Sequence, residues 1–367
     1  MAGGVGSRVC NRPVREMLHD FWPASPPRRM LIARPARIGW RPGPAPQVNR
    51  REFIRSALVL SAATAAARRL GAQANPLKSL APATNAATRF VPLRRDVGIF
   101  TGRGGTIGWL SSKDALAVVD TQFPDTALIC LRGIPGIGAR TIDATINTHH
   151  HVDHTGGNVV FKAASRELVA QANVPSLQFE AAKRAEQATK PDPAALVANQ
   201  VYADTTFPDV WRRELGSEIL TAEFRGPAHT GGDAVVIFER ANVVHMGDLV
   251  FNRMYPFVDR PGGASIRGWI KSLNDSVASY PGDAAYVFGH GNPKFGVTGN
   301  RGDLLVMRDF LSAVMEHVAK EIAAGRDKPA VVGMENFPGF PDFHVPLPNR
   351  LGTVLGAAFD ELTADKA

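Results

Sequence analysis

Residues 148–157 read Thr-His-His-His-Val-Asp-His-Thr-Gly-Gly, and this stretch constrains the chain more than any other. Four imidazoles and one carboxylate fall within six residues, directly after an apolar run at residues 142–146 that is typical of a buried strand. On a helix, His149 and His151 would project about 200° apart, so they point the same way only on an extended or looping backbone. Asp153 and His154, which follow, are adjacent, so the backbone must turn for them to reach a second ligand position. The spacing therefore predicts two ligand sets for two neighbouring metal ions.

Three further landmarks follow in the sequence. Residues 226–233 read Gly-Pro-Ala-His-Thr-Gly-Gly-Asp, Gly-Asp stands at 247–248, and Gly-His-Gly at 289–291. Together with the His-x-His-x-Asp-His motif, they resemble the signature of the metallo-β-lactamase superfamily over about residues 89–300. The resemblance implies an α/β fold, the four-layer αββα sandwich of two sheets covered by helices.

The resemblance also implies seven metal ligands, each on a loop that follows an apolar strand. One ion is expected at His149, His151 and His229, the second at Asp153, His154 and His290, and Asp248 is expected to bridge them. Imidazole and carboxylate donors without a thiolate suit Zn²⁺, and they also fit Fe, Mn or Co. Two divalent ions are thus the expected cofactors, with zinc the first choice.

The other polar residues of this region receive different roles. Two ions would activate a shared water for attack on a carbonyl or phosphoryl centre, and Asp153 would orient that water and carry a proton to the leaving group. Asp120, at the end of a buried strand, is expected to order the loop beneath the ions. His150 should point away from the ions, and His245 should lie in the core or behind the ligands.

The aromatic and proline-rich loop 251–263 follows the expected bridging acid. Its residues Asn252, Tyr255 and Phe257 are candidate substrate contacts, with an ordinary packed connection as the equal alternative. Apolar residues at helical spacing predict core-facing helices over 266–280 and 304–322.

The bridging acid bears on function. Many zinc β-lactamases carry Cys or Ser where Asp248 stands, whereas hydroxyacylglutathione hydrolases, lactonases and phosphodiesterases of the fold carry the acid. The sequence therefore predicts an enzyme that hydrolyses an ester, thioester, lactone or amide bond of a small molecule. A periplasmic β-lactamase, an iron-binding redox or relay protein, and a non-catalytic metal-binding protein remain possible on the same residues.

Charge and composition separate a leader from the rest of the chain. Residues 1–74 hold 13 arginines, no lysine and three acids, whereas 75–367 hold 29 basic and 31 acidic residues, so no nucleic-acid partner is expected. Asn-Arg-Arg-Glu-Phe-Ile-Arg at 49–55, a short apolar run at 56–67 and Ala-Gln-Ala at 72–74 resemble a twin-arginine signal. We expect the twin-arginine machinery to export 75–367 as one hydrolase domain, periplasmic or secreted, without a membrane anchor.

The remaining segments give weaker signals. Short strands are expected at 97–100, 106–110, 115–120, 234–238, 243–246 and 286–288. Ala, Glu and Lys dominate residues 163–190, which predicts a pair of solvated covering helices, and 191–210 is expected to be a surface excursion. Cys130 stands in an apolar run and is expected to be a core residue without a disulfide partner.

Overall fold

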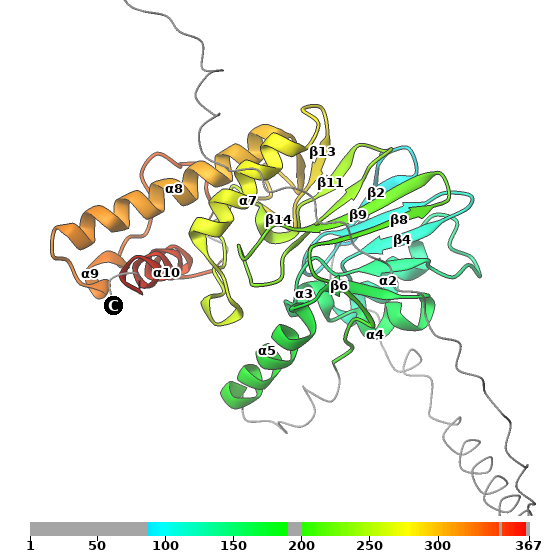
Figure 1. Cartoon of the computed structure of the whole chain (residues 1–367), viewed down its shortest axis with the longest axis horizontal. Helices are drawn as coiled ribbons and strands as arrows, with labels where there is room; N and C mark the ends of the chain where they lie inside the picture. The colour runs from blue at the N-terminus through cyan, green and yellow to red at the C-terminus, as the bar shows by residue number, and fades with distance from the viewer. Residues whose placement is uncertain (1–86, 190–199, 345–346, 365–367) are drawn as a thin grey trace, which may run out of the picture. The chain divides into compact units, whose positions relative to one another are not determined.

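The computed structural model describes residues 87–189, 200–344 and 347–364 (Figure 1). The predicted leader and its signal sequence therefore lie outside the described residues, as do residues 191–199 of the expected surface excursion. Within the described ranges, no helix is both long and apolar enough to cross a membrane.

Seven strands form the first sheet, in the order in which they occur in the chain. They are β1 (Arg89–Arg94), β2 (Val97–Thr101), β3 (Ile107–Ser111), β4 (Leu116–Val119), β5 (Ala144–Ile146), β6 (Leu168–Gln171) and β7 (Thr205–Phe207). The first four pair antiparallel across short turns, and β4 to β7 pair in parallel. A parallel pair needs a crossover, which α2 (Pro124–Gly133) supplies between β4 and β5.

Six strands form the second sheet, in the order β15-β13-β11-β10-β9-β8. They are β8 (Val210–Leu215), β9 (Glu218–Phe224), β10 (Ala234–Phe238), β11 (Val243–His245), β13 (Ala285–Val287) and β15 (Thr298–Gly299). Only β11 and β13 pair in parallel here. A small parallel pair, β12 (Phe251–Asn252) and β14 (His290–Gly291), lies beside the metal-ligand candidates.

Side chains that point alternately to the two faces of each strand divide the interior into three apolar layers. In β4, Ala117 and Val119 face the second sheet, while Leu116 and Val118 face α2 and α4 (Asn158–Phe161). Successive side chains of a strand point to opposite faces, so one strand serves two layers. The second sheet does the same beneath its own helices. The expected αββα sandwich is thereby confirmed.

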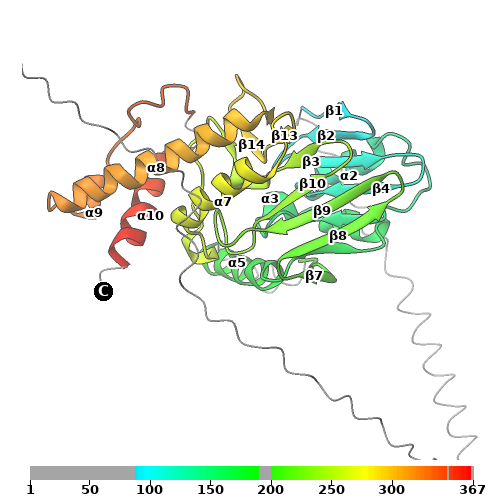
Figure 2. The same ribbon diagram turned by 45° about the horizontal axis from the view of Figure 1, so that its top comes forward.

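Two long helices, α7 (Ile266–Ser279) and α8 (Arg301–Ala323), cover the outer face of the second sheet, and α10 (Arg350–Ala364) packs against α8 and the short α9 (Lys328–Val331). Figure 2 shows α7 and α8 side by side. Buried Glu361 of α10 accepts hydrogen bonds from the backbone nitrogens of Ile266 and Arg267 at the start of α7. A carboxylate at a helix N-terminus satisfies free backbone donors, which here fixes α10 against α7.

The six strands expected from short runs between turn residues are confirmed, with no end shifted by more than one residue, and so are the two core-facing helices. Cys130 is buried and free, as expected for a core residue.

The expectation of two covering helices over residues 163–190 is wrong. Residues Leu168–Gln171 form the buried strand β6, and one helix follows, α5 (Val174–Thr189). The run Leu-Val-Ala-Gln stands among Ala and Glu residues, which favour helices, so its composition resembles that of a helix segment. The expected surface excursion is wrong at its end, because Thr205–Phe207 pairs with β6 as strand β7.

Candidate metal centre

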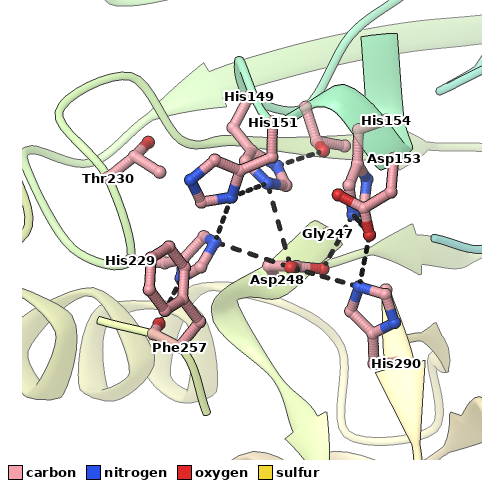
Figure 3. A network of polar contacts seen from close by, with 12 residues as sticks. His149, His151, Asp153, His154, His229, Thr230, Gly247, Asp248, Phe257 and His290 are labelled. Carbon is pink, nitrogen blue, oxygen red and sulfur yellow. Dashed lines mark hydrogen bonds and ion pairs between the residues drawn. The ribbon is translucent and has the colours of Figure 1, made fainter. Parts of the chain in front are cut away.

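All seven predicted ligand positions meet at one end of the two sheets (Figure 3). His149 and His151 follow β5, and the single turn α3 (Val152–Thr155) carries the next two. The other three are His229 between β9 and β10, Asp248 after β11, and His290 after β13. The loop between β5 and α3 is extended at His151, as the two-residue spacing of the histidines requires.

Three imidazoles form the first group, and their ring nitrogens face one another. His151 Nδ1 is 3.0 Å from His149 Nε2 and 3.0 Å from His229 Nε2. The Oδ2 atom of Asp248 is 3.8 Å from His149 Nε2 and 3.5 Å from His229 Nε2. All four donors lie within reach of one ion.

Asp153, His154 and His290 form the second group, on the other side of Asp248. His290 Nε2 is 3.1 Å from Asp153 Oδ2 and 3.4 Å from Asp248 Oδ2. His154 Nε2 is 3.1 Å from Asp248 Oδ1. The Asp248 carboxylate thus contacts both groups, which is the position that a bridging ligand needs.

The partners of the outer ring nitrogens assign the tautomers of His229 and His151. His229 Nδ1 is 2.8 Å from the carbonyl oxygen of Phe257, which only accepts, so this nitrogen donates and Nε2 keeps its lone pair. His151 Nε2 is 3.0 Å from Asp259 Oδ2 and donates likewise. Burial lowers the pKa of His229 to about 3, so its ring is neutral.

Asp120 organises the other two imidazoles from beneath the loop. Its carboxylate accepts from the Thr148 amide at 2.7 Å, from Thr148 Oγ1 at 2.8 Å, and from His154 Nδ1 at 2.8 Å. Because the Thr148 hydroxyl donates to Asp120, it accepts from His149 Nδ1 at 3.0 Å. The inner Nε2 atoms of His149 and His154 therefore both carry lone pairs in the neutral rings. Asp120 lies behind the ligands, as predicted from the sequence.

This donor set fits a pair of divalent cations. The lone pairs of the first group converge at 3.0 Å and repel one another unless a cation lies between them. In the second group, the buried atoms His154 Nε2 and Asp248 Oδ1 lie 3.1 Å apart, yet neither makes a hydrogen bond among the described residues. Carboxylate and neutral imidazole are the ligand forms that divalent metals require.

Asp259 was not predicted from the sequence as a site residue. Its Oδ2 atom contacts His151 Nε2 at 3.0 Å and His150 Nε2 at 3.2 Å, so it orients the ligand histidine and holds its neighbour outside the ligand groups. The one sequence signal for it is its position in the loop that follows Asp248. His245 is buried and its Nε2 is 3.0 Å from the carbonyl oxygen of Thr106, in agreement with a core position.

A cavity of about 620 Å³ opens onto the centre. Of the three candidate substrate contacts, Tyr255 and Phe257 line it and Asn252 does not. The Asn252 side chain is buried and donates to the carbonyl oxygen of Gly296 at 2.9 Å. The opposite wall comes from α5 and from Arg350, neither of which was predicted from the sequence to line a site.

Comparison with known proteins agrees with this geometry. The family model of the metallo-β-lactamase superfamily matches residues 100–291, just over half of the sequence, and the chain belongs to this superfamily. The sec-alkylsulfatase Pisa1 from Pseudomonas sp. is 15% identical with a TM-score of 0.54, over 74% of this chain and 50% of its own. A metallo-beta-lactamase from Pontibacter korlensis is 18% identical with a TM-score of 0.49, over 62% of this chain and 99% of its own.

This chain spans about half the length of the sulfatase, and at that identity the likeness shows a shared fold. Among curated protein sequences, none matches the chain.

Replacing Asp120 with asparagine tests the support beneath the ligands. Asp120→Asn keeps the shape but removes the charge that fixes Thr148 and His154, so zinc affinity should fall about 10- to 100-fold. Competition with a chromogenic chelator measures the affinity. Asp143→Asn is the matched control, because Asp143 also accepts a backbone amide, that of Leu116, and lies outside the candidate metal groups. Equal zinc affinities for the two variants would contradict this role of Asp120.

Proposed function

We propose that this protein is a dinuclear metal-dependent hydrolase, with zinc in both positions, that cleaves an ester, thioester, lactone or amide bond of a small molecule. The convergence of buried lone pairs on both sides of Asp248, at the floor of a cavity, carries the proposal. Iron or manganese would fit the same donors.

When bound, the divalent ions would lower the pKa of a water toward neutrality and polarise the electrophilic oxygen of the substrate. Asp153 differs from the other carboxylate at the centre in its exposure. The Asp153 side chain is 25% exposed, whereas that of Asp248 is 3% exposed. Asp153 can therefore contact the attacking water from the cavity, orient it, and pass its proton to the leaving group. His290 holds that carboxylate in place through the 3.1 Å contact.

The cavity walls exclude water from the reacting groups. Phe251, Met254 and Phe257 come from the loop after β11, and Ala181 and Ala182 come from α5. Apolar walls around a few polar groups are typical of small-molecule sites of this volume. They also strengthen the electrostatic interactions at the centre, because less solvent screens them.

Metal analysis with a substrate panel tests the proposal directly. The purified protein should hold two zinc equivalents, and it should hydrolyse at least one ester, thioester, lactone or amide. A chelator should remove the activity and lower the melting temperature by several degrees, because ligand binding stabilises the folded state. Zinc should restore both. An intact zinc load with no turnover on the panel would instead indicate a non-catalytic metal-binding protein.

The same measurements distinguish the hydrolase from a β-lactamase and from a redox protein. Chelator-sensitive turnover of nitrocefin would indicate a β-lactamase, and coloured, iron-rich protein would indicate a redox or relay role. The fold shared with Pisa1 adds a secondary alkyl sulfate to the panel.

Removing the Asp153 carboxylate tests the catalytic assignment. Asp153→Ala should lower kcat about 100- to 10,000-fold at saturating zinc, the range for a lost general acid or base. Circular dichroism and the melting temperature should show an intact fold. Asp342→Ala is the control, because Asp342 is a surface carboxylate paired with Lys294. Near-native turnover in Asp153→Ala would rule out the assigned role.

We further propose that the twin-arginine machinery exports the protein to the periplasm and that a signal peptidase cleaves it after about residue 74. The Arg pair at 50–51 and the arginine-rich, lysine-free leader support this proposal. Arg50→Lys with Arg51→Lys should abolish the periplasmic form, because the transporter reads both arginines. Fractionation and N-terminal sequencing measure this, and unchanged export of the double variant would exclude the pathway.

A further inference from the structure

A single fixed cation lines the cavity beside the metal centre. Arg350, the first residue of α10, is the only Arg or Lys among the lining residues of the described chain. Its guanidinium carbon lies 5.2 Å from the centre of the Phe257 ring. The Phe257 ring in turn lies 5.5 Å from the imidazole of His151. Arg350 is therefore connected to the metal side of the cavity through one aromatic residue, Phe257.

Among the side chains that the structure describes, this arginine has no acidic partner of the kind that buried guanidinium groups ordinarily have. In the described ranges, no carboxylate lies within ion-pair distance of Arg350, although it is only partly exposed. Other half-buried arginines of the chain, such as Arg253 and Arg260, are paired with Asp303 and Glu361. Burial lowers the pKa of Arg350, and no acidic neighbour offsets this. A partly desolvated, unpaired cation is costly unless a ligand supplies the anion.

We propose that Arg350 is a specificity residue that binds a carboxylate at the far end of the substrate, so the preferred substrate is a small organic acid with an apolar body. This rests on the proposed hydrolase function for its catalytic test. The scissile bond would lie at the metal groups, the apolar body against Phe257 and α5, and the carboxylate at Arg350. One guanidinium matches one planar, singly charged carboxylate through paired hydrogen bonds.

The position of Arg350 is well fixed, as recognition requires. Glu361, three turns along α10, binds the start of α7 and accepts from Arg260 at 3.2 Å. The cation–π contact with Phe257 holds the guanidinium toward the cavity mouth. Phe257 is 39% exposed, so its ring can contact a substrate while still supporting Arg350.

Two matched esters test the proposal: the mono-para-nitrophenyl ester of adipic acid and para-nitrophenyl hexanoate, which lacks the terminal carboxylate. Arg350→Met should lower kcat/KM for the adipate ester about 10- to 100-fold, mostly through KM, and change it for the hexanoate ester less than about threefold. Arg350→Lys should recover part of the preference. Arg326→Met is the charge control, because Arg326 is exposed and pairs with Glu321 on the surface. Equal losses on both esters, or none, would overturn the proposal.

A binding measurement separates this proposal from the hydrolase proposal. Calorimetry on metal-free protein, with hexanoate and hexanol as probes, needs no turnover. Hexanoate should bind wild type more tightly than hexanol, and Arg350→Met should weaken hexanoate binding about 10-fold or more while hexanol is unaffected. If neither ester is hydrolysed but hexanoate binding shows this dependence, the hydrolase function fails and Arg350 remains an anion site. If hexanoate binding is independent of Arg350, the inference fails, whatever the activity.

Discussion

The metal centre depends on the buried carboxylate of Asp120, which belongs to neither candidate metal group. Asp120 accepts three hydrogen bonds from the motif loop and α3, and these bonds set which nitrogen is free in His154 and, through Thr148, in His149. A buried charge is tolerated only when its hydrogen-bonding capacity is filled, so Asp120 and the loop constrain each other. The inner lone pairs are consequently directed at the centre before any cation is present. The folded protein thus already holds several lone pairs close together, where they repel one another. A cation between them relieves this repulsion, which makes its binding favourable.

Close packing within each half of the fold, and hydrogen bonds between the halves, complete this arrangement. Gly105 packs so tightly on the His154 ring that a Cβ there would lie 2.2 Å from its Cε1 atom, and a Cβ on Gly289 would lie 1.9 Å from Asp248 Oδ1. Backbone hydrogen bonds cross between the halves, from the Thr106 amide to the carbonyl oxygen of Gly289 and from the Ala234 amide to that of Thr148. The ligands of the two halves are thus held at fixed separations by main chain, which side-chain motion does not alter.

The sequence predicted the features that depend on residues close together in the chain. The motif of four histidines and an acid shows its chemistry within six residues, and short runs bounded by turn residues identified most of the strands. Strand β6 was missed because Leu-Val-Ala-Gln stands among Ala and Glu residues that favour helices. Asp259 and Arg350 could not be predicted as site residues either. Their roles depend on a loop and on a helix start that only tertiary packing brings to the cavity.

The residues of the site come from two different regions of the chain. Every metal-ligand candidate falls within residues 100–291, the range that matches the superfamily. Helix α10, with Arg350 at its first residue, lies beyond that range and supplies the cation of the cavity wall. Membership of the superfamily therefore bears on the candidate metal ligands, whereas the proposed carboxylate site lies in a segment that the family model does not match. Under this proposal, a substitution at position 350 would change the choice of substrate while leaving the Asp120 hydrogen bonds beneath the ligands in place.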